Sequence, residues 1–146
     1  MFNMNKNIWQ VSNTKSTTAS SKAIWKRWTA VSEWPEEDNS LEWAKIEGDF
    51  AVGTKIIMKP KGFPKSSVVI TKLIPNKSYV TTGNIPLGKM TIEHTLVTKN
   101  GNTIFTHTIS LTGPMRNIFA KFVAQKMADN LPEKMRNIAR LAEKNG

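Results

Sequence analysis

The sequence contains no cysteine. A disulfide framework, a thiolate metal site and a cysteine nucleophile are therefore excluded. Long apolar runs are also missing: no stretch approaches the length of a membrane span, and the N-terminal residues lack the apolar segment of a secretory signal. We therefore expect a soluble, cytoplasmic protein without a transmembrane segment.

Common site motifs are missing as well. The chain has no glycine-rich phosphate loop, no Gly-x-Ser-x-Gly elbow, no His-Glu-x-x-His and no zinc-ligand spacing. The adjacent Glu93 and His94 do not form half of a metalloprotease motif, because they lie on a predicted strand where neighbouring side chains point to opposite faces. We expect neither a metal nor a cofactor.

Acidic residues are missing from the middle of the chain. Residues 50–92 contain seven lysines and no acid, whereas residues 1–49 contain six basic and seven acidic residues. The lysines alternate with apolar residues, which is typical of a solvated strand face. A surface for anionic lipid, an acidic ligand or nucleic acid is the other interpretation. Although the net charge is +10, we do not expect a nucleic-acid partner.

The composition that remains is typical of one folded domain spanning residues 1–146. Hydrophobic residues make up 39% of the chain, with five Trp and six Phe, and a chain of this length can bury a core without staples. The pattern predicts a helix from an N-cap at Ser20 or Ser21 to about Ser32, stopped by Pro35, and a loop or short helix at 36–40. The predicted strands are 8–15, 41–48, 53–60, 66–74, 77–84, 88–98 and 102–112.

A long C-terminal helix is predicted from Gly113-Pro114, where the apolar period changes to 3.6. Pro132 should kink or split it by clashing with the carbonyl of Ala128, and Asn130 with Glu133 would recap its second half. The predicted fold class is α+β, with a curved antiparallel sheet of six to seven strands around this helix and an apolar cavity between them. Its apolar stripe comprises Met115, Ile118, Phe119, Phe122, Met127, Leu131, Met135, Ile138 and Ala142.

Asn100-Gly101 is the strongest local signal, because Asn-Gly between alternating strands predicts a two-residue hairpin turn. The turn places His94 opposite His107 on the face that looks inward. Threonine and serine dominate the other face. The apolar cross-strand pairs on the inward face are Met90 with Leu111, Ile92 with Ile109, and Leu96 with Phe105.

The two histidines allow several roles. They can satisfy each other, a hydroxyl or water within an ordinary core, or they can recognise a hydroxyl or carbonyl of a ligand in an apolar cavity. General acid/base catalysis by His94 and His107 is the catalytic alternative. A metal site is disfavoured, because no third ligand lies on the same face.

Three segments carry a resemblance to a known family: residues 19–25, the Trp34-Pro35 pair, and residues 46–54. Together with residues 101–107 and 131–135, they resemble the START-like (SRPBCC) superfamily, which includes polyketide cyclase/dehydrase-like and plant-allergen-type proteins. The resemblance spans nearly the whole chain and implies the helix-grip fold, with a cavity for hydrophobic metabolites. It implies no catalytic residue. The acidic run Glu36-Glu37-Asp38 departs from many relatives and predicts a more acidic cavity mouth.

The leading functional hypothesis is binding or carrying of a small hydrophobic molecule between the sheet and the C-terminal helix. A polyketide cyclase/dehydrase-type enzyme and an anionic-surface interaction module are the alternatives, and the oligomeric state stays open. The predicted ligand-binding residues are Met90, Ile92, His94, Leu96, Phe105, His107, Phe119 and Phe122.

Overall fold

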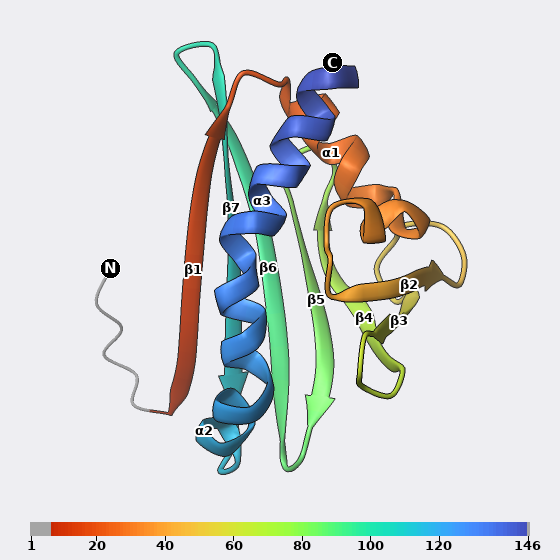
Figure 1. Ribbon diagram of the computed structural model, residues 1–146, viewed down its shortest axis with the longest axis vertical. Coiled ribbons are helices and arrows are strands. Elements are labelled where there is room, and N and C mark those ends of the chain that lie inside the picture. The colour runs from red at the N-terminus through yellow and green to blue at the C-terminus, as the bar shows by residue number, and fades with distance from the viewer. Residues whose placement is uncertain (1–6, 146) are drawn as a thin grey trace.

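The computed structural model describes residues 7–145 and contains one seven-stranded antiparallel sheet with helices on its concave side (Figure 1). The strand order is β1-β7-β6-β5-β4-β3-β2, so every strand pairs with its sequence neighbour except β1, which pairs with β7. This arrangement confirms the predicted helix-grip α+β fold. The strands are β1 Ile8–Thr17, β2 Leu41–Ile46, β3 Lys55–Pro60, β4 Ser66–Ile74, β5 Ser78–Ile85, β6 Gly88–Lys99 and β7 Asn102–Thr112.

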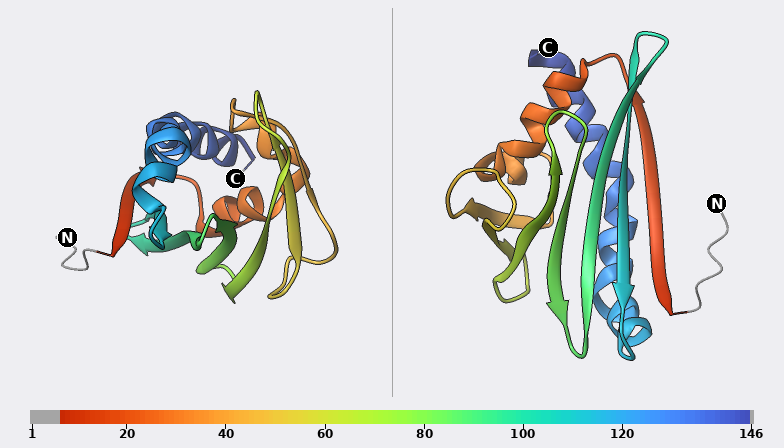
Figure 2. Two further views of the ribbon diagram at one scale, coloured as in Figure 1. Left: turned by 90° about the horizontal axis from the view of Figure 1, so that it is seen from below. Right: turned by 180° about the vertical axis from the view of Figure 1, so that it is seen from behind.

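The sheet curls because two of its strand pairs are irregular. Register shifts occur between Leu41 and Trp43 on β2 and between Ile70 and Lys72 on β4, and such bulges increase local twist and bend a strand. Seen from below, the sheet curves around the space beside the C-terminal helix (Figure 2). The curvature brings the β2–β4 side of the sheet toward that helix.

The β6–β7 hairpin has the predicted register. Asn100 and Gly101 form the two-residue turn with φ values of 53° and 83°, which suit a type I′ turn. His94 therefore pairs with His107, as expected from the turn. On the other face, the hydroxyls of Thr106 and Thr108 form hydrogen bonds with those of Thr14 and Ser12 on β1.

The N-terminal helix α1, Ser21–Thr29, begins at the predicted cap. The hydroxyl of Ser20 accepts a hydrogen bond from the backbone N–H of Ala23 at 3.1 Å, which satisfies a donor that the first helical turn leaves free. The α-helix ends earlier than predicted, and Pro35 lies inside a following 3-10 helix, η1, Val31–Glu36. After that short helix, Glu37 and Asp38 of the acidic run are buried, whereas Glu36 stays exposed.

The C-terminal helical region has three parts, α2 Arg116–Phe119, a π-helical segment η2 Ala120–Ala124, and α3 Gln125–Asn145. Of the predicted kink or split at Pro132, the split is wrong, because α3 runs through this residue and the irregular segment lies before it. Asp38 ties this part of α3 to the loop after η1, since it accepts a hydrogen bond from Asn130 and pairs with Lys134, on both sides of the proline. Asn130 and Glu133 therefore contact the loop after η1 and do not recap the helix.

The π-helical segment changes which side chains face the sheet. Ala120 and Ala124 are buried against Ile85 and Leu111, whereas Ile118 and Phe122 are 53% and 61% exposed. The predicted stripe placed the two larger residues inside. A π segment adds a residue to the turn and shifts the phase of the helix, so small residues meet the sheet and bulky ones face solvent.

Gly88, the first residue of β6, lies where the β5–β6 turn closely approaches the end of β7, and its substitution tests this contact. A Cβ at this position would lie 2.0 Å from the backbone oxygen of Thr112, which cannot rotate away. We expect Gly88→Ala to lower the free energy of unfolding by about 3 kcal/mol, measured by urea denaturation. In the control Gly83→Ala the new Cβ meets a Val68 methyl at 3.1 Å, and we expect a loss below about 1 kcal/mol. Equal losses in the two variants would contradict this explanation.

Candidate functional site

A cavity of about 380 Å³ lies between the concave face of the sheet and α3. Most of its wall is apolar, with side chains from β3, β4, β6, β7 and α3. Polar groups gather where η1 and α3 approach the strands. The polar and aromatic residues at this end are Trp28, Glu37, Asp38, Tyr79, His94, His107 and Lys134.

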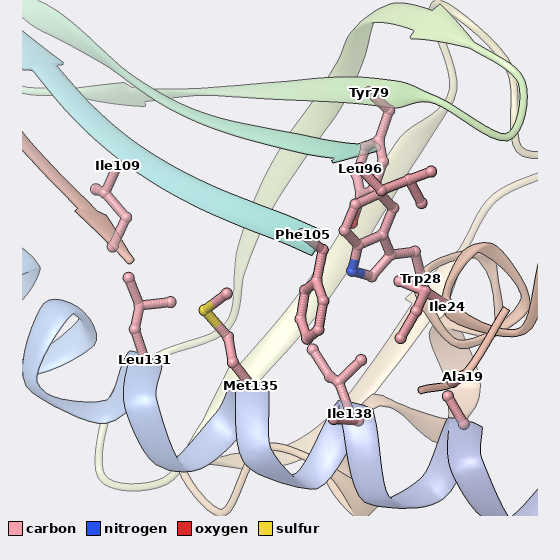
Figure 3. Close-up of a cluster of buried hydrophobic side chains, with 12 residues drawn as sticks. Ala19, Ile24, Trp28, Tyr79, Leu96, Phe105, Ile109, Leu131, Met135 and Ile138 are labelled. Atoms are coloured by element: carbon pink, nitrogen blue, oxygen red, sulfur yellow. The ribbon is translucent and has the colours of Figure 1, made fainter. Parts of the chain in front are cut away.

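The structure brings five of the eight predicted site residues to the cavity: Met90, Ile92, His94, His107 and Phe119. Leu96 and Phe105 do not line it, because they belong to the closed core around Trp28 and Ile138 (Figure 3). Phe122 points away from the cavity wall and is 61% exposed. Its position follows from the phase change in η2.

His94 is buried against an aromatic ring. Its imidazole stacks on Tyr79, with ring centroids 4.0 Å apart and an interplanar angle of 5°. Burial, together with the positive charge of Lys134, lowers the pKa of His94 to about 3. The imidazole is therefore neutral at physiological pH.

His107 is held in one tautomer by Trp28. The indole N–H of Trp28 donates to Nε2 of His107 at 3.2 Å, so this nitrogen must carry the lone pair. Burial, with His94 and Lys134 nearby, lowers the pKa of His107 well below its usual value. The proton of the neutral ring then lies on Nδ1, a buried atom that has no hydrogen-bond partner among the described residues.

Glu37 lines the cavity and is only 2% exposed, although it is not among the ligand-binding residues predicted from the sequence. One of its oxygens accepts a hydrogen bond from Arg27 at 3.0 Å, and Arg27 also pairs with Glu33. Burial raises the pKa of Glu37 to about 7, against the lowering effect of Lys134 and Arg27. The acidic run is evident in the sequence, but the inward orientation of Glu37 and Asp38 depends on η1.

Asp38 and Lys134 form the rest of the polar end. The ammonium of Lys134 lies 3.6 Å from a carboxylate oxygen of Asp38, and its side chain is 24% exposed. Asp38 also accepts hydrogen bonds from Ser40 and Asn130, and these groups with Lys134 lower its pKa although burial raises it. The polar end thus contains the ammonium of Lys134, paired with Asp38, and the carboxyl group of Glu37, whose pKa is about 7. It also contains the two neutral imidazoles of His94 and His107.

No family model matches the sequence, and no curated protein matches it. Solved structures do match. A di-domain aromatase/cyclase, StfQ from the steffimycin biosynthetic pathway, has a TM-score of 0.76 at 12% identity, over 94% of this chain and 51% of that chain. This chain therefore spans about half the length of StfQ.

Two further structures resemble the chain over most of their length. Norcoclaurine synthase from Thalictrum flavum, solved with dopamine and hydroxybenzaldehyde, has a TM-score of 0.72 at 17% identity, over 95% of this chain and 88% of that one. A START superfamily protein from Mycobacterium smegmatis has a TM-score of 0.70 at 13% identity, over 90% of this chain and 97% of that one. The chain has the START-like fold.

Among residues 7–145, no three His, Asp or Glu side chains are arranged to hold a metal ion. No helix of that part is both long and apolar enough to cross a membrane.

The buried imidazole of His94 predicts a pH-dependent stability. The pKa of His94 is lowered in the folded state. Its contribution to the free energy of unfolding is therefore complete above pH 6.5 and is lost as the pH falls toward about 3. By linkage this loss is about 2 kcal/mol at pH 5. We expect His94→Gln to be less stable than wild type at pH 8 and the difference to shrink by that amount at pH 5.

Urea denaturation at the two pH values measures this difference. The opposite effect of Glu37, whose raised pKa costs stability as the pH rises toward about 7, is present in both proteins and cancels. A stability difference that is the same at pH 5 and pH 8 would show that His94 is not buried as a neutral imidazole.

Proposed function

We propose that the protein binds a small, mainly apolar molecule that carries one polar group, as a carrier or receptor. The observation that supports this most is the combination of an apolar cavity with one polar end. A volume of about 380 Å³ falls within the range of small-molecule sites. Burying roughly 200 Å² of apolar ligand surface would contribute about 5 kcal/mol before ordering costs.

The polar end favours a ligand with an oxygen acceptor, such as a carbonyl, hydroxyl or carboxylate. Lys134 supplies an ammonium beside the neutral imidazoles of His94 and His107, and all three residues line the cavity. Electrostatic interactions are stronger at a buried site than in water, so an oxygen acceptor near this ammonium would contribute to affinity. Apolar walls and a few such groups together give affinity and orientation.

Filling the cavity should weaken binding of an apolar probe. Met90 lines the cavity from β6, whereas Val97 lies on the outer face of the same strand and is 58% exposed. We expect Met90→Trp to weaken binding of N-phenyl-1-naphthylamine, followed by fluorescence, by at least about tenfold. Val97→Trp, with the same new side chain, should bind as wild type does.

Native mass spectrometry of the protein purified from its own host is the companion measurement. We expect an adduct of a small molecule on wild type and its loss on Met90→Trp. Probe binding that is equal in the two tryptophan variants would refute the cavity as the binding site.

Proton transfer is a second candidate function, favoured by Glu37. The two histidines are poor candidates for the base, because their lowered pKa values leave them weakly basic. Glu37 instead lines the cavity with a pKa of about 7, which suits a general base near neutral pH. The ammonium of Lys134 would stabilise an oxyanion formed when a proton leaves the substrate.

The Kemp elimination of 5-nitrobenzisoxazole tests this base. A carboxylate removes the proton from C3, the N–O bond breaks, and the electron pair ends on a coloured phenolate. We expect Glu37→Gln to reduce the rate by about a hundredfold, with wild-type activity rising with pH to half its maximum near pH 7. Glu33→Gln is the matched control, since Glu33 also pairs with Arg27 but does not line the cavity.

The histidines provide the discriminating variant. If Glu37 is the base, the double variant His94→Gln, His107→Gln should retain the rate within about tenfold while folded by circular dichroism. A hundredfold loss there, with Glu37→Gln still active, would assign the proton transfer to an imidazole.

A further inference from the structure

The cavity reaches the surface at one end of the molecule. Several of its lining residues are themselves exposed, and most of them come from the β3–β4 turn, the end of β5 and the start of α3. The opening therefore lies between that turn and the C-terminal helical region. The exposed lining residues are Ser40, Lys61, Phe63, Pro64, Ser66, Ser67, Asn84 and Lys126.

Bulky apolar side chains surround this opening. Phe63 is 40% exposed, Leu87 in the β5–β6 turn is 79% exposed, and Ile118 and Phe122 follow on α2 and η2 at 53% and 61%. The β5–β6 turn and α2 lie together at the lower end of the molecule, with the β3–β4 turn on the same side (Figures 1 and 2). Such a group of exposed apolar residues indicates a contact surface.

These residues belong to one continuous rim. The ammonium of Lys126 lies 5.5 Å from the ring of Phe63, which links the β3–β4 turn to the start of α3. The ammonium of Lys121 lies over the ring of Phe122, 5.7 Å from its centroid. On the other side, the backbone of Leu87 is in close contact with Gly113, just before α2.

The charge of this rim has one sign. Residues 50–92 and 113–128 contain no acidic residue, whereas seven lysines lie in the first range and Arg116, Lys121 and Lys126 in the second. The next acid on the helix, Asp129, accepts a hydrogen bond from Gln125. The entrance surface, as we call it, comprises Phe63, Leu87, Ile118 and Phe122 with Lys61, Lys65, Lys89, Lys121 and Lys126.

We propose that the entrance surface docks on an anionic lipid bilayer, with its apolar side chains in the interfacial region and its lysines at the lipid headgroups. Lysines that flank exposed aromatic and aliphatic residues match both layers of such an interface. A second copy of the chain is disfavoured as the occupant, because it would bring two acid-free cationic surfaces together. Nucleic acid would match the lysines but would leave Leu87 and Ile118 without an apolar partner.

Docking of this kind would place the cavity opening against the membrane. An apolar molecule could then pass between the bilayer and the cavity without crossing water, which avoids exposing its apolar surface. The inference goes beyond the proposed binding function, because docking needs only the outer surface. It also implies that the ligand is taken up from the bilayer, or delivered to it, as an apolar molecule dissolved there.

Co-sedimentation with lipid vesicles tests the docking. We expect the wild-type chain to bind vesicles of two parts phosphatidylcholine to one part phosphatidylglycerol at least about tenfold more tightly than pure phosphatidylcholine vesicles. The double variant Phe63→Ser, Phe122→Ser should bind the anionic vesicles about tenfold more weakly. The control Ile74→Ser, Val97→Ser removes apolar residues that are 55% and 58% exposed near the C-terminal ends of β4 and β6, away from the β3–β4 and β5–β6 turns, and should bind as wild type does.

A second pair of variants separates docking from general attraction of a basic protein. Lys65→Glu, Lys121→Glu changes the entrance surface, whereas Lys72→Glu, Lys77→Glu makes the same change of net charge near the β4–β5 turn at the other end. We expect only the first pair to reduce vesicle binding by about tenfold or more at moderate salt.

Three results would overturn the proposal: no binding to anionic vesicles, equal loss in the two lysine pairs, or unchanged binding in the phenylalanine pair. Tight binding of polyuridylic acid in place of vesicles would assign the surface to nucleic acid. Met90→Trp should still bind vesicles, so failure of docking and failure of the ligand cavity are distinguishable.

Discussion

One helix cannot cover the concave face of a curled seven-stranded sheet, and most features of this molecule follow from that constraint. α3 packs along β1 and α1, and it leaves the side over β3 to β6 partly open. Trp28 fills the upper part of this space, where its ring meets Tyr79 and Phe105 (Figure 3). The same ring also meets His94 and His107. Below it the space remains as the cavity.

The polar end of the cavity is stable because each buried charge has a partner from a different element. Arg27 of α1 holds Glu37, and Asp38 holds Asn130 and Lys134 of α3. The backbone carbonyl of Glu37 also accepts a hydrogen bond from Asn137. Removing one partner of such a pair would leave a charge without compensation, so the site and the packing of α3 depend on the same contacts.

The C-terminal helical region serves the two ends of the cavity differently. Beyond Pro132 its apolar face closes the core through Met135, Ile138 and Ala142. Before Asn130, the π-helical segment turns Ala120 and Ala124 inward and Phe122 outward. Close approach of helix and sheet at this end requires small side chains, and the larger residues are displaced to the rim of the opening.

The sequence by itself determined the strands, the Asn100-Gly101 hairpin with its histidine pair, the Ser20 cap and the fold class, because these depend on local turn chemistry and on apolar periodicity. The tertiary structure decided the rest. Glu37 faces the cavity only because η1 folds against α1, and Phe122 faces solvent only because η2 changes the helical phase. Pro132 stays within a continuous helix, and Asp38, which is distant in the sequence, binds the helix on both sides of it. Contacts between segments far apart in the chain decide these orientations, and no local pattern of residues encodes them.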